Sequence, residues 1–157
     1  MKNRIEILSR KDAEFLIKND YLGNTAAISF YDPHSKRTPK DYAPVDYKNL
    51  CAKVFYVGVP DIDIEILSDY GLTYNTYLPE AAALAEFIIS AAEEELDIIC
   101  QCEYGQSRSA ACAAAIKEYF DGNGIEVFAD YRYYPNQLIF NKVLNALKER
   151  GAKKADD

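Results

Sequence analysis

The sequence predicts an α/β fold: a single domain with a mostly parallel sheet of four to five strands, flanked by helices. Two observations lead to this prediction. Short apolar runs rich in β-branched residues alternate with longer amphipathic runs, and clusters of Gly, Pro, Asn and Asp separate them. Strands that alternate with helices along a chain form parallel sheets with both faces covered. We expect one domain over residues 1–150, with 151–157 as a polar, frayed tail.

The first sixty residues supply three of the expected strands and one helix. The strands are residues 5–8, 25–30 and 52–59, because these runs combine apolar, β-branched and aromatic side chains. Ser9 is placed to cap a helix over residues 10–17. Three prolines, at positions 33, 39 and 44, indicate that residues 31–49 form a long polar loop.

The rest of the chain supplies one further strand and three helices. We expect an irregular stretch over 60–77, a helix from Pro79 to residue 95, a strand over 97–101, an alanine-rich helix over 109–120 and a final helix opened by Pro135. The segment between the strand and the alanine-rich helix lies at the carboxyl end of a parallel strand. Sheets of this kind bind their ligands there.

Composition and charge exclude several classes of partner and cofactor. A net charge of −7 leaves no basic surplus for nucleic acid or for an anionic membrane surface. No apolar run approaches the ~20 residues that a membrane span needs. The charged N-terminus argues against an export signal, so we expect a cytoplasmic protein with free thiols. With one histidine in the chain, we expect no metal site, and we expect no cofactor.

The segment from Cys102 to Arg108, CEYGQSR, has the chemistry of an anion-binding loop that contains a nucleophile. Its backbone amides and the N-terminus of the following helix converge on one point. Gly105 permits a tight turn around an anion, and Arg108 can bind two phosphate oxygens through its planar guanidinium. We expect the Cys102 thiol to have a pKa below ~8.5, because amide dipoles and the guanidinium favour the thiolate.

The octapeptide CEYGQSRS resembles the C-x-x-G-x-x-R-S/T signature of the cysteine-based protein tyrosine and dual-specificity phosphatases. Residues 56–63 are similar to the strand and loop that deliver the general acid in dual-specificity enzymes. Residues 133–138 resemble the start of the last helix in small bacterial members, so the resemblance covers roughly residues 53–147.

The resemblance implies roles for individual residues. Cys102 attacks phosphorus and forms a thiophosphate intermediate, Arg108 holds the phosphate, and Ser109 donates a hydrogen bond that helps the thiolate leave. An aspartate protonates the leaving oxygen, and we rank Asp63 first, with Asp61 next. Asp69 is a third candidate for this acid. The substrate-binding loop consists of Glu103, Tyr104, Gly105, Gln106 and Ser107.

Two positions depart from the family's pattern. The residue before the nucleophile is usually His, and here it is Gln101, which forms hydrogen bonds but carries no positive charge. We therefore expect a less depressed pKa for Cys102 than in His-containing relatives, and slower turnover at low pH. Asp63 lies farther upstream of Cys102 than the acid of compact dual-specificity members.

The function that the resemblance implies is phosphomonoester hydrolysis, on a phosphorylated protein or a small phosphomonoester. Phosphotyrosine is the leading substrate, with phosphoserine and phosphothreonine as further ones. The alternatives are a pseudophosphatase that binds phosphate without turnover and an inositol phosphate phosphatase, although Glu103 in an acidic chain does not suit a highly anionic substrate. Cys100 and Cys112 are either small core residues or partners for an oxidised Cys102.

Overall fold

The computed structural model describes residues 3–156, and its centre is a sheet of four strands. In sheet order the strands are β1 (Ile5–Leu8), β4 (Asp97–Gln101), β2 (Thr25–Tyr31) and β3 (Lys53–Gly58). All three neighbouring pairs are parallel, so the predicted α/β fold of one domain with a parallel sheet is confirmed. The register pairs Gln101 with Leu8 on one side and Ser29 on the other, so the segment after β4 emerges between β1 and β2.

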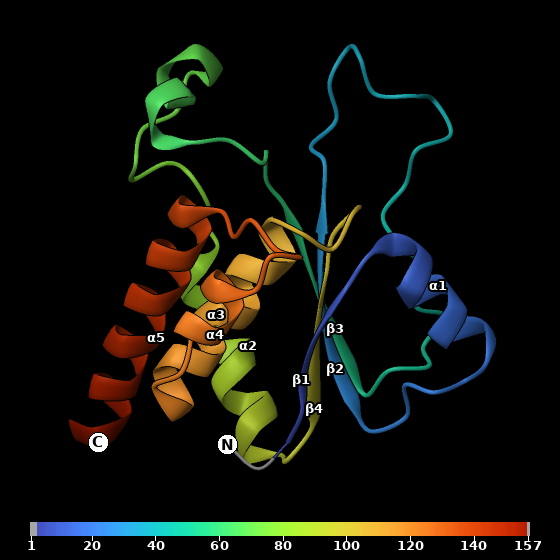
Figure 1. Cartoon of the computed structure of the whole chain (residues 1–157), viewed down its shortest axis with the longest axis vertical. Helices are drawn as coiled ribbons and strands as arrows, with labels where there is room; N and C mark the ends of the chain where they lie inside the picture. The colour runs from blue at the N-terminus through green and yellow to red at the C-terminus, as the bar shows by residue number, and fades with distance from the viewer. Residues whose placement is uncertain (1–2, 157) are drawn as a thin grey trace.

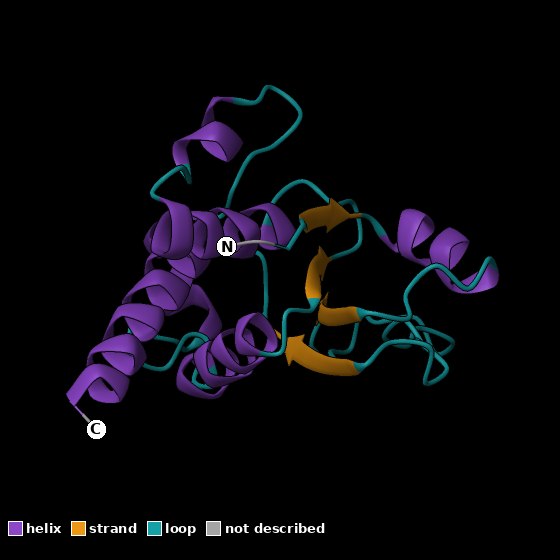
Figure 2. Cartoon of the chain, turned by 90° about the horizontal axis from the view of Figure 1, so that it is seen from below, coloured by secondary structure: helices purple, strands orange, loops and turns teal. Residues whose placement is uncertain are grey.

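Helices cover both faces of the sheet, but unequally (Figures 1 and 2). One face is covered by α2 (Ala81–Glu93), α3 (Arg108–Asp121), α4 (Ile125–Ala129) and α5 (Gln137–Asp156), and the other by α1 (Arg10–Lys18). The main core lies on the four-helix side, where residues of α2, α3 and α5 pack against Ile28, Phe30 and Ile98. The small side chains of α3 allow its first half to be fully buried, which places the N-terminus of this helix directly beside the sheet.

The C-terminal helix is longer than the sequence predicts. Helix α5 continues to Asp156, so residues 151–156 are helical where we expected a frayed tail. Two ion pairs explain the difference, because Arg150 contacts Glu86 and Lys154 contacts Glu93, both on α2. None of the helices over residues 3–156 is long and apolar enough to cross a membrane.

The face of α1 also carries the long loop between β2 and β3. Val45 and Tyr47 of this loop are buried, and they pack with Ala13 and Ile17 of α1 against Ile99 of β4. The loop is polar and rich in proline, as predicted, but these two apolar contacts tie it to the sheet. Most other residues of the loop are exposed, so these two buried side chains join it to the core beside β4.

Two short helices were not predicted. A 3₁₀ helix, η1 (Ile64–Tyr70), occupies the stretch that we expected to be irregular, and it ends at Gly71 in the left-handed conformation. Helix α4 follows the turn at residues 121–124. Both are too short to show the apolar periodicity from which longer helices are predicted. In Figure 1, η1 stands above the carboxyl ends of the strands.

Candidate active site

The loop from Cys102 to Ser107 connects β4 to α3, as the sequence predicts. It turns at Gly105, whose φ of +68° suits glycine. A Cβ atom there would lie 2.7 Å from the amide nitrogen of Ser9 and 2.9 Å from the carbonyl carbon of Leu8. Gly105 is therefore required twice, for the direction of the turn and for the close approach to the chain after β1.

Cys102 is buried at the start of this loop, and its sulfur lies 3.2 Å from the hydroxyl oxygen of Ser109. Burial by itself raises the pKa of the thiol. Hydrogen bonds from the Ser109 hydroxyl and from the amides of Ser109 and Gly105, with the charge of Arg108, outweigh burial, so the pKa of Cys102 lies below its ordinary value. The expected direction of this pKa shift therefore agrees with the geometry.

Arg108 begins α3 and is 5% exposed. One of its terminal nitrogens donates to the carbonyl oxygen of Val59 (3.0 Å) and lies 2.7 Å from a carboxylate oxygen of Asp32. Its Nε is buried and has no hydrogen-bond acceptor among the described residues. A buried cationic donor without an acceptor is costly, so this part of the guanidinium suits an anion bound in the loop.

Asp61 is the acidic residue that contacts the loop from the segment after β3. Its Oδ1 accepts hydrogen bonds from the Ser107 hydroxyl and from the side-chain amide of Asn136, both at 2.8 Å. Asn136 also donates to the carbonyl oxygen of Ile62 (3.1 Å), and its backbone amide donates to the carbonyl oxygen of Ser107 (3.2 Å). These contacts join the Asp61 segment, the loop and the start of α5.

Asp63, which we ranked first as general acid, precedes η1 and forms no hydrogen bond to the loop within residues 3–156. It lines the same hollow as Asp61 and Ser107. Asp69 lies within η1 and is not part of the lining of this hollow. The structure thus brings Asp61 to the loop more closely than either of the other two candidates.

The hollow beside the loop has a volume of about 740 Å³. Aromatic and acidic side chains dominate its lining, which includes Asp61, Asp63, Glu65, Tyr74, Phe128, Tyr133 and Tyr134. No Lys or Arg lines it in the described part of the chain. The hollow therefore offers aromatic surface and negative charge beside Ser107 of the loop, whereas Cys102 and Arg108 are not part of its lining.

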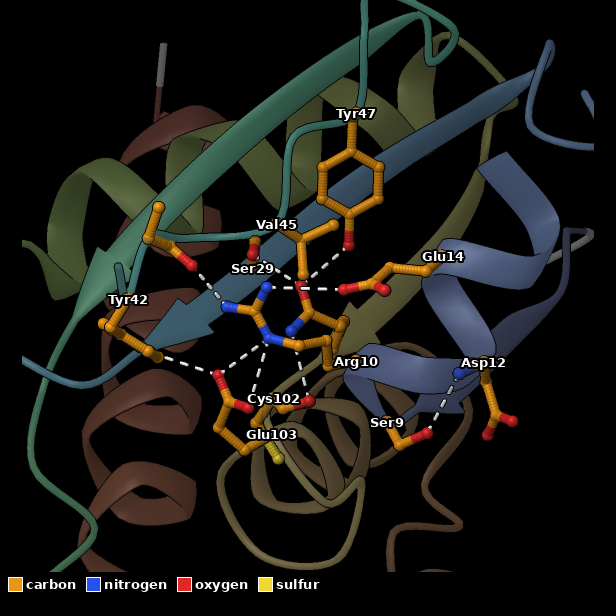
Figure 3. Close-up of polar contacts among 12 residues, drawn as sticks. Ser9, Arg10, Asp12, Glu14, Ser29, Tyr42, Val45, Tyr47, Cys102 and Glu103 are labelled. Carbon is orange, nitrogen blue, oxygen red and sulfur yellow. Dashed lines mark hydrogen bonds and ion pairs between the residues drawn. The ribbon is translucent and has the colours of Figure 1, made fainter. Parts of the chain in front are cut away.

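Not all side chains of the predicted substrate-binding loop face this hollow. The carboxylate of Glu103 binds Arg10 of α1, with oxygens 3.1 and 3.2 Å from Nε, and accepts from the Tyr42 hydroxyl at 3.1 Å (Figure 3). Tyr104 is 83% exposed, and Gln106 is exposed. Glu103 therefore anchors the loop to the α1 side and is not directed to the hollow.

Several residues that contribute to this site could not be identified from the sequence. Asp32, Asn136, Tyr42 and Tyr47 contact the loop or its neighbours from segments far away in the chain. No local pattern distinguishes them from ordinary loop residues, because their importance depends on the packing of distant segments. The residues 3–156 also contain no group of three His, Cys, Asp or Glu side chains arranged to hold a metal ion.

Comparison with solved structures shows which fold this is. PTPMT1 in complex with PI(5)P matches with a TM-score of 0.56 at 12% identity, over 96% of this chain and 94% of that chain. The human tyrosine phosphatase-like serine/threonine/tyrosine-interacting protein matches at 0.53 and 16% identity, over 94% and 87%. Tk-PTP in its active form matches at 0.52 and 16% identity, over 95% and 94%. The chain has the protein tyrosine phosphatase fold.

No protein-family model matches the sequence, and no curated protein sequence matches it either. The phosphatase fold is thus established from the arrangement of the backbone, at sequence identities of 12–16% in these three comparisons. Within this phosphatase fold, the residues of the loop have to account for the chemistry.

Proposed function

We propose that the protein is a phosphomonoester hydrolase of the protein tyrosine or dual-specificity phosphatase class, with Cys102 as its nucleophile. One observation supports this most directly. The Cys102 thiol, with its lowered pKa, shares a loop with Arg108, whose Nε is buried without an acceptor. A nucleophile and an unsatisfied cationic donor at one helix N-terminus are suited to hold a phosphate and attack it.

In the first step, the Cys102 thiolate attacks phosphorus in line. The P–S bond forms as the bond to the leaving oxygen breaks, and the general acid gives its proton to that oxygen. Arg108 and the loop amides hold the equatorial phosphate oxygens. In the second step, the same carboxylate takes a proton from water, the water oxygen attacks phosphorus, and sulfur leaves as a thiolate. The Ser109 hydroxyl, 3.2 Å from the sulfur, stabilises this thiolate.

In this proposal Asp61 is the general acid. Ser107 and Asn136 hold its Oδ1 against the loop, which leaves Oδ2 to carry the proton that is transferred. Asp63 remains the alternative, because it lines the same hollow. The contacts of Asp61 support placing it ahead of Asp63 in this proposal.

The lining of the hollow supports an aryl phosphate, such as phosphotyrosine in a protein, as the substrate. Tyr133 and Tyr134 offer aromatic surface, whereas Asp61, Asp63 and Glu65 would repel further phosphate groups. PTPMT1 has been solved with PI(5)P, so a phosphoinositide is the second candidate substrate. All four cysteines are free thiols, which supports a cytoplasmic site of action.

The proposal is tested by turnover of p-nitrophenyl phosphate, with rapid-quench trapping of phosphate on Cys102. We expect wild-type protein to accumulate a covalent phosphoenzyme and Cys102→Ser to lose turnover by roughly 10⁴-fold or more. Wild-type rates in Cys102→Ser would refute the mechanism. If wild-type protein bound a phosphotyrosine peptide without any turnover, the pseudophosphatase alternative would be correct. A panel with PI(5)P distinguishes the two substrate classes.

The general acid is tested with Asp61→Asn and Asp63→Asn, each on a poor and a good leaving group. Asp61→Asn should slow phenyl phosphate by roughly 10²-fold but barely affect 2,4-dinitrophenyl phosphate, since that oxygen leaves without protonation. Asp63→Asn serves as the matched control and should leave both rates near the wild-type values. The opposite result would restore Asp63 as the acid.

A further inference from the structure

Both chain neighbours of Cys102 are held by tyrosine hydroxyls from the loop between β2 and β3. Tyr47 contacts Gln101, the residue before the nucleophile, and Tyr42 contacts Glu103, the residue after it. Both tyrosines reach β4 and its loop from the α1 side of the sheet (Figure 3). Asp61 contacts the loop from the segment after β3, and Arg108 follows the loop directly, so the two tyrosine hydroxyls form a separate support.

The contact of Tyr47 is buried and fully specified. The side-chain oxygen of Gln101 accepts from the Tyr47 hydroxyl (2.8 Å) and from the Ser29 hydroxyl (2.5 Å). These two donors occupy the oxygen, so the side-chain nitrogen of Gln101 is directed to the carbonyl oxygen of Cys102, at 3.1 Å. Tyr47 and Gln101 are each 1% exposed, so no solvent competes for these bonds.

The contact between Tyr42 and Glu103 lies nearer the surface and is supported by Arg10. Its hydroxyl accepts from the backbone amide of Asp32 (2.9 Å) and donates to Glu103 (3.1 Å). The guanidinium of Arg10 binds the same carboxylate and also lies over the Tyr42 ring, and the backbone amide of Arg10 donates to the Glu103 carbonyl oxygen (3.1 Å). Glu103 is thus held at both its side chain and its backbone.

We propose that Tyr47 and Tyr42 are positioning residues that fix the peptide units on the two sides of Cys102 and so keep its sulfur within reach of Ser109 and the loop amides. Tyr47 has the larger effect on the position of Cys102. Without its hydroxyl, the Gln101 side-chain oxygen would keep only the neutral Ser29 hydroxyl as a donor. Glu103 would keep Arg10 if Tyr42 lost its hydroxyl. The positioning stands on these contacts, and only its catalytic consequence rests on the proposed function.

Neither hydroxyl adds a charge to the site. Burial raises the pKa of both Tyr47 and Tyr42 above the ordinary value, so both stay neutral over the range in which Cys102 titrates. The ionisable groups near the thiol and its loop include Arg108, with Asp32 paired to it, Cys100 of β4, Glu103, which is paired to Arg10, and Asp61, which accepts from the Ser107 hydroxyl. Tyr-to-Phe variants keep every one of these groups and add or remove no charge, and Tyr42→Phe takes from Glu103 only a neutral hydrogen bond. A shift in the titration of Cys102 would therefore report its position.

The experiment follows alkylation of Cys102 by iodoacetamide as a function of pH, measured by mass spectrometry in Tyr47→Phe, Tyr42→Phe and the double variant. In Tyr47→Phe we expect the midpoint to move up by roughly 0.5 to 1 pH unit, because sulfur and amides separate and the thiolate loses hydrogen bonds. In Tyr42→Phe the shift should have the same sign and be smaller. The double variant should show at least the shift of Tyr47→Phe.

Tyr56→Phe is the matched control. Its hydroxyl donates to the carbonyl oxygen of Val45 (2.8 Å) and so anchors the same loop without touching Gln101 or Glu103. In Tyr56→Phe the midpoint of Cys102 alkylation should equal that of wild-type protein, even if the melting temperature of the variant falls as far as that of Tyr47→Phe. Equal midpoints in all variants, or an equal shift in Tyr56→Phe, would overturn the proposal. Alkylation requires no turnover, so an upward shift in a protein without phosphatase activity would refute the proposed function and leave the positioning role intact.

Discussion

Cys100 and Cys102 lie two residues apart and are both buried, yet the pKa values of their thiols move in opposite directions. The pKa of Cys100 is well above its ordinary value because of its hydrogen bond with Cys112 and its burial. Burial raises the pKa of Cys102 too, but the hydrogen bonds of the loop and the charge of Arg108 reverse the shift. Burial alone therefore does not decide whether a cysteine of this chain is a nucleophile.

The difference follows from where strand β4 ends. Cys100 lies inside the strand, in register with Ile7 and Ile28, and the backbone amides around it bond to the neighbouring strands. Cys102 lies just beyond the strand, and its own amide still donates to the carbonyl oxygen of Leu8 (3.2 Å). The amides of Gly105 and Ser109, by contrast, donate to its sulfur. Two positions along the chain thus separate a thiol whose pKa is raised from one whose pKa is lowered. The redox role considered for Cys100 and Cys112 stays a prediction.

The largest expected effect is selective alkylation. With iodoacetamide at pH 7 and wild-type protein, Cys102 should react at least roughly a hundredfold faster than Cys100, since only its thiol has a lowered pKa. Peptide mass spectrometry separates the two sites. In a denaturant the two rates should converge, because the hydrogen bonds that distinguish the thiols are lost. Equal alkylation rates of Cys100 and Cys102 in the folded protein would contradict the difference between their pKa values.

Next in size is the effect of Gly105→Ala. An added Cβ atom would meet the backbone at Ser9 and Leu8, so the loop must move and turnover of p-nitrophenyl phosphate should fall about a hundredfold. Gly122→Ala is the control, because Gly122 has the same φ of +68° but no heavy atom within 4 Å of such a Cβ. That variant should lose about 1 kcal/mol of stability and keep its turnover. Equal losses of turnover in both variants would show that φ alone is responsible.

Ser109→Ala should lower kcat/KM by about tenfold on the acidic limb of its pH profile. The Ser109 hydroxyl contributes to the lowered pKa of Cys102, so its removal lets the pKa rise and leaves less thiolate at a given pH below it. The acidic limb of the pH profile of kcat/KM should therefore move to higher pH, and the deficit should shrink as the pH rises. Ser109→Thr keeps the hydroxyl and should keep the profile. An unchanged acidic limb in Ser109→Ala would show that the hydroxyl does not tune this thiol.

The smallest expected effect on turnover is that of Cys100→Ala. The variant should lose about 1 to 2 kcal/mol of stability, because it leaves a small cavity beside Cys112 in the main core. Its kcat and the alkylation midpoint of Cys102 should match those of wild-type protein. Chemical denaturation measures the stability. Turnover of p-nitrophenyl phosphate measures kcat, and alkylation by iodoacetamide as a function of pH measures the midpoint. A shifted midpoint would mean that Cys100 acts on the nucleophile through β4.

The sequence by itself determined the α/β class, the four strands and the loop from Cys102 to Arg108. Strands and long helices are recognised by local periodicity, and the turn at Gly105 and the helix after it are likewise local. The same reasoning placed Cys102 and Arg108 in one loop. It failed for η1 and α4, which are short, and for the end of α5, which depends on ion pairs with α2.

Only the tertiary structure decided how the two cysteines differ and which residues hold the chain on both sides of Cys102. The lowered pKa of Cys102 depends on distances to Ser109 and Arg108 that follow from the position of α3 against the sheet. Gln101 and Glu103 accept hydrogen bonds from Tyr47 and Tyr42, which lie 54 and 61 residues away from them in the chain. Contacts between such distant segments leave no local pattern, because the packing of the whole domain brings them together.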